Sequence, residues 1–362
     1  MPDNLKDLSQ AGVSIWLDDL SRDRLQSGSL AKLIEGSNVV GVTTNPSIFS
    51  AAIKGSALYR EDILTLKGEG KSTSEVVTEL TTKDVKDACD LFLPVFKRTS
   101  GIDGRVSIEV DPFFAHETQK TIDHGKELWN IVNRPNLLIK VPATLEGSPA
   151  IEELTASGIS VNVTLIFSVE RYEKVMDAYL RGLERRVSSG QAVSEIHSVA
   201  SLFVSRIDGE IDKRLDAKGS TSPLRGKIAV ANAHLTYEAF LKMIRSDRWK
   251  KLASAGANLQ RPLWASTGVK DKAYESTRYV IELVAKDCVN TMPEGTLNEV
   301  REHGLVRGDT ISSNFKSASD LFASLPTAGV DFEDVVAFLE KDGVKKFADA
   351  WQELLDNVSA VA

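Results

Sequence analysis

The stretch LLIKVPA, residues 137–143, places a single lysine, Lys140, near the end of an apolar run. Leucine and isoleucine bounded by Asn136 and Pro142 are typical of a strand buried on both faces. An ammonium group in such a strand costs several kcal/mol unless it is paired or loses its proton. An unprotonated lysine amine can attack a carbonyl carbon to form a Schiff base. The alternative is a lysine just beyond the strand, with its ammonium group in solvent.

Other short apolar runs with strand character recur along the chain, and amphipathic stretches separate them. The predicted strands cover residues 13–18, 39–44, 105–110, 137–141, 159–165, 196–203, 262–267 and 288–292. The predicted helices between them include residues 22–33, 116–132, 169–187, 238–253 and 276–285. Eight strands that alternate with helices predict an α/β fold, the closed (β/α)8 TIM barrel.

Two regions contain predicted helices beyond those that a simple (β/α)8 barrel needs. Residues 46–100, after the second strand, contain two or three predicted helices where one would suffice to connect the strands. From about residue 312 the chain predicts further helices, and residues 332–338 and 344–355 are strongly amphipathic. No linker rich in Pro, Gly or Ser separates a second domain. We therefore predict one barrel domain over residues 1–362, with a C-terminal helical extension from about residue 312.

Five successive predicted strands each carry a polar side chain at or near the carboxyl end. These residues are Asp18, Asn45, Glu109, Lys140 and Thr164. In a barrel of parallel strands all these ends meet at one mouth, where active sites are built. The carboxylates can serve as general acid and base, and the lysine as the covalent centre. The pattern therefore favours a chemical role for Lys140 over a merely solvated one.

The composition argues against several classes of protein. A formal net charge of −7 is unfavourable for a nucleic-acid-binding surface. The N-terminal residues lack a signal-peptide core, and no apolar run reaches the roughly 20 residues of a membrane helix, so we expect a cytoplasmic protein. Cys89 and Cys288 form no CxxC pattern and suit a reducing compartment. The five histidines show no metal-binding spacing, so no metal site is expected.

Two motifs, VTTNPS at residues 42–47 and LIKVPAT at residues 138–144, closely resemble the signatures of the transaldolase family. The order of Asp18, the first motif, Glu109, the second motif, Asn162 and Thr164 also matches that family. SLFVSR at residues 201–206 resembles its Ser-x-Phe-x-x-Arg segment. The resemblance spans roughly residues 12–300, and the paired motifs are not general features of barrels.

The resemblance implies a Schiff-base transferase of the non-oxidative pentose phosphate pathway that needs neither metal nor organic cofactor. It would move a dihydroxyacetone unit from sedoheptulose 7-phosphate to glyceraldehyde 3-phosphate, giving erythrose 4-phosphate and fructose 6-phosphate. Lys140 would form the imine with the donor ketone. Asp18 would take a hydroxyl proton as the C3–C4 bond breaks and return it to the acceptor. Glu109, with Thr164, would hold a water molecule that carries protons during imine formation.

The resemblance also assigns residues to substrate binding. Asn45, Asn162 and Ser201 would hydrogen-bond the hydroxyl groups of the dihydroxyacetone unit. Arg206 would bind the phosphate group, for which a planar bidentate donor is suited. The implied partners are therefore sugar phosphates, with no nucleic acid and no membrane, and the sequence leaves the oligomeric state open between monomer and homodimer.

The chain departs from the family pattern at the seventh strand. The family often places a second phosphate-binding arginine after an Ala-Ser pair there, whereas residues 264–270 read WASTGVK. Lys270 is the predicted substitute, because Arg261 precedes the predicted strand and is expected at the opposite end of the barrel. A register error of one residue would exchange Asp18 for Asp19, but the apolar run ending at Leu17 favours Asp18.

Other functions stay open on the sequence alone. A Schiff-base aldolase that releases free dihydroxyacetone from fructose 6-phosphate, or a deoxyribose-phosphate aldolase-like enzyme, would use the same lysine. The absence of a tyrosine at these strand ends favours transfer. A non-catalytic barrel that binds sugar phosphates is a further alternative, and such a protein has no need of Lys140, Asp18 and Glu109.

Overall fold

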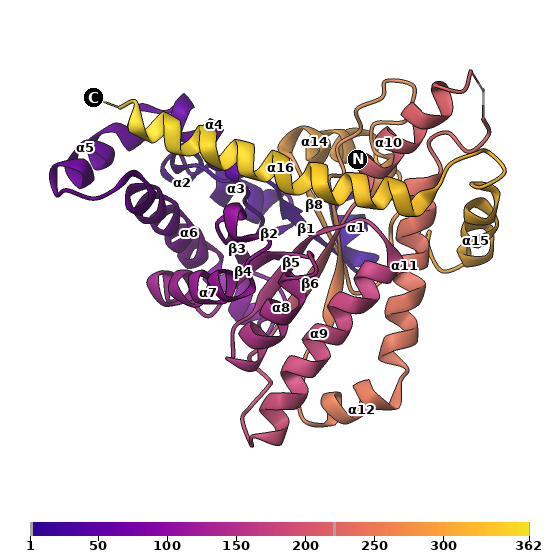
Figure 1. The fold of residues 1–362 in the computed structure, drawn as a ribbon, viewed down its shortest axis with the longest axis horizontal. Helices are drawn as coiled ribbons and strands as arrows, with labels where there is room; N and C mark the ends of the chain where they lie inside the picture. Colours follow the sequence, from indigo (N-terminus) through magenta and orange to yellow (C-terminus); the bar gives the residue numbers. More distant parts are fainter. Residues whose placement is uncertain (1–2, 220–221, 362) are drawn as a thin grey trace.

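Eight parallel strands close into a barrel in the order β1 to β8 in a computed structural model that describes residues 3–219 and 222–361 (Figure 1). The strands are β1 Val13–Leu17, β2 Val39–Val42, β3 Arg105–Glu109, β4 Leu137–Pro142, β5 Val161–Ile166, β6 Ser198–Phe203, β7 Gln260–Ala265 and β8 Cys288–Met292. Each strand overlaps its predicted range. The predicted (β/α)8 barrel is therefore confirmed.

Helices surround this barrel, and one of them crosses its carboxyl end. They are α1 Asn4–Gln10, α2 Arg22–Gln26, α3 Ser29–Gly36, α4 Pro46–Gly55, η1 Ala57–Tyr59, α5 Arg60–Gly68, α6 Thr73–Arg98, η2 Pro112–Phe114, α7 Thr118–Val132, α8 Gly147–Ala156, α9 Val169–Ser188, α10 Val204–Asp216, α11 Ile228–Ile244, α12 Asp247–Ser254, α13 Arg278–Ile281, α14 Glu294–His303, α15 Phe315–Ser324 and α16 Phe332–Ser359. The extra helices predicted after the second strand are α4, α5 and α6, and those at the C-terminus are α15 and α16.

Three predicted helices differ from the observed ones. The range 22–33 is divided into α2 and α3 at Gly28, whose φ of 73° lies in the left-handed region that glycine adopts readily. The range 238–253 is divided because Ser246 accepts a hydrogen bond from Trp249 N and begins the new helix α12. In the range 276–285 only α13 is helical. Hydrophobic periodicity alone did not reveal these interruptions.

The strands are buried on both faces, and large side chains fill the barrel. Every residue of β3 to β8 is buried. The indole ring of Trp16 lies so close to β2 that a Cβ atom at Gly41 would come within 2.6 Å of it. Position 41 therefore has to be glycine, because any side chain there would clash with the ring of Trp16 when β1 and β2 pair.

Polar side chains close the amino end of the barrel around the carboxylate of Asp103. Its oxygens accept hydrogen bonds from Ser14 Oγ at 2.7 Å and Trp16 Nε1 at 3.2 Å. Arg261 Nη2 forms an ion pair with the same carboxylate at 2.9 Å. Arg261 thus lies at the end of the barrel opposite the mouth, as expected, and takes no part in the site described below.

The C-terminal helix α16 crosses the carboxyl end of the barrel, as the yellow ribbon in Figure 1 shows. It packs against α4 and α6, which follow β2, and against α10, which follows β6. The two amphipathic stretches predicted here are parts of this one continuous helix. Its buried face is a stripe of residues spaced three or four apart, comprising Val335, Leu339, Gly343, Phe347, Trp351, Leu354 and Val358.

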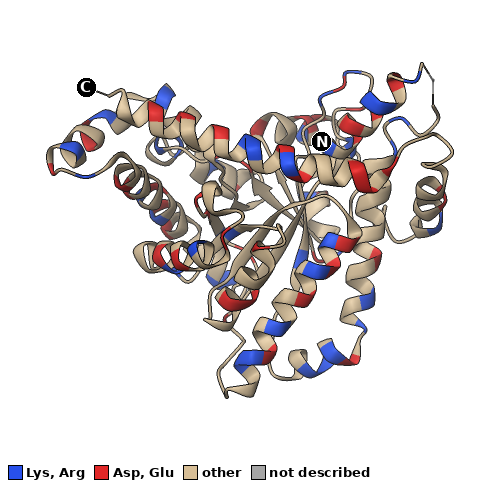
Figure 2. Cartoon of the chain, in the orientation of Figure 1, with Lys and Arg blue, Asp and Glu red and all other residues tan. Residues whose placement is uncertain are grey.

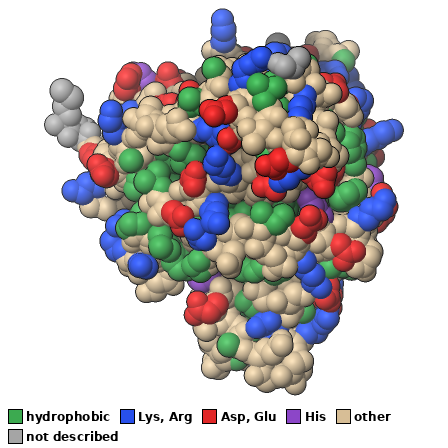
Figure 3. Space-filling view, turned by 90° about the vertical axis from the view of Figure 1, so that its left-hand side faces the viewer, with side chains coloured by type: hydrophobic (Ala, Val, Ile, Leu, Met, Phe, Trp, Pro, Cys, Tyr) green, Lys and Arg blue, Asp and Glu red, His purple; other side chains and the backbone are tan. Residues whose placement is uncertain are grey.

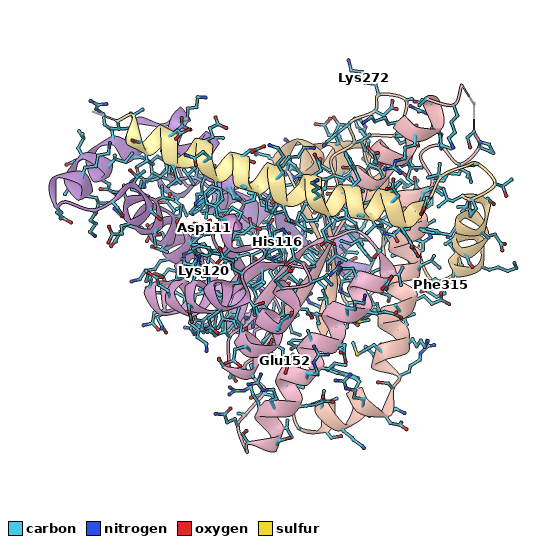
Figure 4. All side chains as sticks on the ribbon, in the orientation of Figure 1. Asp111, His116, Lys120, Glu152, Lys272 and Phe315 are labelled. Carbon is cyan, nitrogen blue, oxygen red and sulfur yellow. The ribbon has the colours of Figure 1, made fainter. Side chains whose placement is uncertain are left out.

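The helix comes closest to the barrel at Gly343. A Cβ atom there would lie 3.0 Å from Leu165 Cδ2 and 3.6 Å from Arg206 Nη1. Leu165 has a φ of 61°, at an irregularity in the pairing of β5 with β6. In Figure 4, Asp111 and His116, from the segment after β3, lie beneath the ribbon of α16. The helix therefore covers the mouth from the β2 side to the β6 side.

None of the helices in residues 3–219 and 222–361 has both the length and the apolar character needed to cross a bilayer.

Candidate active site

A cavity of about 400 Å³ lies at the mouth of the barrel under α16. It is lined by Asp18, Thr43, Asn45, Ser47, Lys140, Thr164, Ser201, Phe203, Arg206, Ala265, Ser266, Thr291, Lys346 and Phe347. Six of the nine residues predicted for the site are among them. Of the other three, Glu109 lies beside Lys140, whereas Asn162 and Lys270 do not line the cavity.

A larger groove of about 1980 Å³ runs outside the barrel between α9, α11, α15 and α16. His116 and Phe315, both labelled in Figure 4, are among the residues that line it. This groove contains none of the predicted site residues. The smaller cavity is the candidate active site because it holds the buried lysine and a carboxylate together.

Lys140 lies in β4 with its side chain inside the barrel and is only 4% exposed. Its Nζ donates a hydrogen bond to the carbonyl oxygen of Thr44 at 3.0 Å and lies 3.8 Å from Glu109 Oε1. The ring of Phe347, from α16, covers the amine at 5.6 Å from ring centre to Nζ. Glu109 and Lys140 are register partners in β3 and β4, which brings both side chains to one level. The solvent-exposed alternative for Lys140 is therefore wrong.

Asp18 follows the last residue of β1 and faces into the cavity. Its Oδ1 accepts a hydrogen bond from Thr43 Oγ1 at 2.6 Å. Removal from bulk water raises the pKa of Asp18, and the charge of Lys140 opposes this rise. Asp19 instead pairs with Arg24 at 2.6 Å and does not line the cavity. The register of β1 therefore gives Asp18, and not Asp19, access to a bound substrate.

Glu109 and Thr164 carry buried polar atoms that have no hydrogen-bond partner in the described part of the chain. These atoms are both carboxylate oxygens of Glu109 and Oγ1 of Thr164. Burial raises the pKa of Glu109 from 4.5 to about 7, with Lys140 opposing and Asp18 reinforcing the rise. Near neutral pH this carboxyl group therefore exists in both protonation states, as a proton-transfer group requires.

We expect Glu109→Gln to flatten the pH dependence of stability. Because burial raises the pKa of Glu109 above its unfolded value, its contribution is fully present below about pH 4.5 and is lost as pH rises through about 7. A shift of this size corresponds to about 3 kcal/mol. Urea unfolding between pH 4.5 and 8 should show this loss in the wild type and in Glu238→Gln, an exposed control, but not in Glu109→Gln. An equal slope in all three proteins would contradict the shift.

The predicted hydroxyl-binding residues occupy different positions. Asn45 lines the cavity and begins α4, where its Oδ1 accepts a hydrogen bond from Ile48 N at 3.1 Å. Asn162 is fully buried, and its Nδ2 donates to Ser107 Oγ at 3.0 Å. Ser201 lines the cavity and donates to Asn162 Oδ1 at 2.7 Å. In this arrangement Asn162 holds Ser201 in place.

Arg206, in α10, lines the cavity and brings positive charge to it. Its guanidinium group stacks on Phe203 at 4.9 Å, and its buried Nη1 has no hydrogen-bond partner among the described residues. Burial lowers the pKa of Arg206. Lys270 as a whole residue is exposed. Partial burial of its amine and the positive charges of Arg206 and Lys346 lower its pKa, so the amine lies near these two residues.

Several lining residues were not among those predicted. Thr43 lies inside the quoted VTTNPS motif, and its position before two polar residues at a strand end was an available signal. Lys346 and Phe347 come from α16, whose amphipathic pattern predicts a helix but does not indicate which face of the barrel it covers. The hydrophobic periodicity of this segment therefore could not place Lys346 or Phe347 at the mouth of the barrel.

Comparison with known proteins agrees with this geometry. The chain matches the family described as Transaldolase/Fructose-6-phosphate aldolase over residues 15–358. It is 54% identical to a transaldolase of Saccharopolyspora erythraea and 56% identical to one of Mycolicibacterium smegmatis, each over 355 residues covering 98% of this chain and 96% of the relative. It is 54% identical to transaldolase 2 of Streptomyces coelicolor over 362 residues, covering 99% of this chain and 97% of that protein. The match extends past residue 300, where the predicted resemblance ended, and includes nearly all of α16. The chain therefore belongs to the transaldolase/fructose-6-phosphate aldolase family.

Proposed function

We propose that this protein is a transaldolase that transfers a dihydroxyacetone unit from sedoheptulose 7-phosphate to glyceraldehyde 3-phosphate through a Schiff base on Lys140. The observation that carries the proposal is the buried amine of Lys140, 3.8 Å from Glu109 in a barrel mouth that also holds Asp18. Membership of the family supports the reaction class.

The first step is formation of the imine. The unprotonated amine of Lys140 attacks the C2 carbonyl carbon of the donor, whose oxygen takes up protons and leaves as water. Glu109, with a pKa of about 7, can give and take these protons. Its oxygens and Thr164 Oγ1 need hydrogen-bond partners, and one water molecule between them would meet this need while relaying protons.

The second step is cleavage and transfer. Asp18 removes the proton from the C4 hydroxyl group, the C3–C4 bond breaks, and its electron pair moves into the iminium group to give an enamine on Lys140. The aldehyde product leaves, and the enamine carbon attacks the aldehyde carbon of the acceptor. Asp18 then returns its proton to the new hydroxyl group, and a water molecule hydrolyses the new imine to release the ketose product and the amine of Lys140. The raised pKa of Asp18 favours this return, because a weaker carboxylic acid holds the proton between the two half-reactions.

The walls of the cavity favour transfer over simple aldol cleavage. An aldolase must protonate the enamine and then bring water to the imine after the aldehyde has left. The aromatic side chains that line this cavity are Phe203 and Phe347, and neither carries a hydroxyl group to donate a proton. Without such a donor the enamine is protonated slowly and persists until an acceptor aldehyde arrives.

Substrate binding uses the polar residues of the cavity. Asn45 and Ser201 would bind the hydroxyl groups of the dihydroxyacetone unit, with Asn162 holding Ser201. The guanidinium group of Arg206 would bind the phosphate group. Lys270 would add positive charge near that end of the cavity.

We further propose that the protein works in the cytoplasm as one domain, a monomer or a homodimer, with sugar phosphates rather than nucleic acid or membranes as partners. Cys89 and Cys288 are both free, buried thiols, which suits a reducing compartment. On the face shown in Figure 3, hydrophobic side chains are interspersed with charged ones. The net charge of −7 disfavours nucleic-acid binding.

The function is tested by supplying fructose 6-phosphate with erythrose 4-phosphate. We expect sedoheptulose 7-phosphate and glyceraldehyde 3-phosphate as products, measured by a coupled reduction of the triose phosphate. Without an acceptor, release of free dihydroxyacetone should be much slower than transfer. Equal rates would favour an aldolase, and no consumption of fructose 6-phosphate would favour a non-catalytic barrel.

A further inference from the structure

An ion pair on α16 lies beside the cavity. Lys346 lines the cavity, and its Nζ lies 2.6 Å from Oδ2 of Asp342, one helical turn earlier. Gly343 follows Asp342 and brings the helix backbone against Arg206, with a Cβ position 3.6 Å from Arg206 Nη1. Figure 2 shows acidic and basic residues following one another along this helix. Asp342 and Lys346 are therefore next to the arginine that faces the cavity.

This end of the cavity holds more positive than negative charge. Arg206 and Lys346 line it, and Lys270 lies near enough for both to lower its pKa. The negative charge of Asp342 raises the pKa of both Arg206 and Lys270 and so partly offsets the lowering. The buried Nη1 of Arg206 has no hydrogen-bond partner among the described residues. A buried donor of this kind beside clustered cations is suited to an anionic group.

We propose that Lys346 binds the phosphate group of the substrate together with Arg206, and that Asp342 holds Lys346 until the phosphate arrives. The side chain of Lys346 is 60% exposed and that of Asp342 25%, so the lysine is free to turn from one anion to the other. A phosphate dianion carries more charge than the carboxylate and offers more acceptor oxygens. Asp342 therefore competes with phosphate for the same cation. This inference rests on the proposed function, because it assumes a phosphorylated substrate in this cavity.

The experiment measures binding of inorganic phosphate to the full chain by titration calorimetry, which does not depend on the reaction. We expect Lys346→Met to weaken binding by about tenfold, the effect of losing one charge-assisted contact at a partly exposed site. Asp342→Asn should tighten binding severalfold because the competing charge is gone. Lys345→Met, which removes the neighbouring exposed lysine that pairs with Asp349, is the matched control and should bind as the wild type does.

Kinetics provide a second readout. Lys346→Met should raise KM for fructose 6-phosphate with little change in kcat, and should leave the rate measured with unphosphorylated fructose at its wild-type value. Lys346→Arg should restore most of the affinity, because it restores the charge. Damage to α16 would instead lower the rates on both sugars.

Opposite effects of the two substitutions separate this proposal from structural damage. Unchanged phosphate affinity in Lys346→Met, or weaker binding in Asp342→Asn, would overturn it. A parallel loss of rate on phosphorylated and unphosphorylated sugar would also overturn it. If phosphate binds as expected but no imine forms at Lys140, the proposed function fails while the phosphate site stands.

Discussion

Replacing Lys140 with alanine is expected to abolish transfer and to leave no sugar adduct on the chain after borohydride reduction. In the wild type, incubation with fructose 6-phosphate followed by reduction should add one dihydroxyacetone-derived group at Lys140, located by peptide mass spectrometry. The buried amine of Lys140 lies beside Glu109, which can carry the protons of imine formation. We expect the rate to fall by about 10⁴-fold or more, as when other covalent enzymes lose the nucleophile.

The cavity offers a built-in control for this prediction, because a second amine lines it. The side chain of Lys346 is largely exposed and its amine pairs with the carboxylate of Asp342, so we expect no adduct there. An adduct at Lys346 or Lys270 would contradict the assignment of Lys140. Reduction without sugar gives the background, and thermal unfolding shows whether Lys140→Ala still folds.

Asp18→Asn is expected to stop the reaction between imine formation and carbon–carbon cleavage. In the proposed mechanism Glu109 serves the first step, so the imine at Lys140 should still form. Asparagine cannot take the proton of the C4 hydroxyl group, so borohydride should trap the whole six-carbon sugar instead of a three-carbon fragment. Transfer should fall by about 10²–10⁴-fold, the usual contribution of a general acid–base group.

Asp19 provides the matched control for this substitution. It is the next residue, but it pairs with Arg24 outside the cavity. Asp19→Asn should therefore keep turnover within a fewfold of the wild type and should trap the three-carbon fragment. Normal transfer by Asp18→Asn with loss in Asp19→Asn would mean that the two carboxylates exchange roles.

The barrel and its central residues were predictable because the relevant signals are local. Each strand is a short apolar run, and the polar residue at its end is visible in the sequence without knowledge of the fold. The carboxyl ends of parallel strands meet at one mouth, which is why Glu109 and Lys140 were expected together there, and the structure makes them register partners. The family motifs then added the expected roles.

The contribution of α16 could not be predicted because it depends on contacts between distant parts of the chain. Its position is set by the approach of Gly343 to Leu165 and Arg206, which precede it by more than a hundred residues. One signal was present, since a glycine inside an amphipathic helix often marks a close approach of two backbones. That signal does not name the partner, so Lys346 and Phe347 were missed.

Some details of the site also depend on packing rather than on sequence pattern. Asn162 was expected to contact substrate, which stays a prediction; it is fully buried, bonds to Ser201 and Ser107, and does not line the cavity. A polar residue in a strand that faces the barrel interior is visible in the sequence, but its depth relative to the cavity is not. The depth follows from the stagger of neighbouring strands.

The helix that covers the mouth is synthesised after all eight strands of the barrel. All eight strands, with Lys140 in β4, leave the ribosome before α16 does, because β8 ends at Met292 and α16 begins at Phe332. Until α16 packs across the strand ends, Phe347 does not cover the amine of Lys140 and Lys346 is absent from the cavity. The order of residues along the nascent chain therefore delays completion of the reactive pocket until the elements that form its walls have been synthesised.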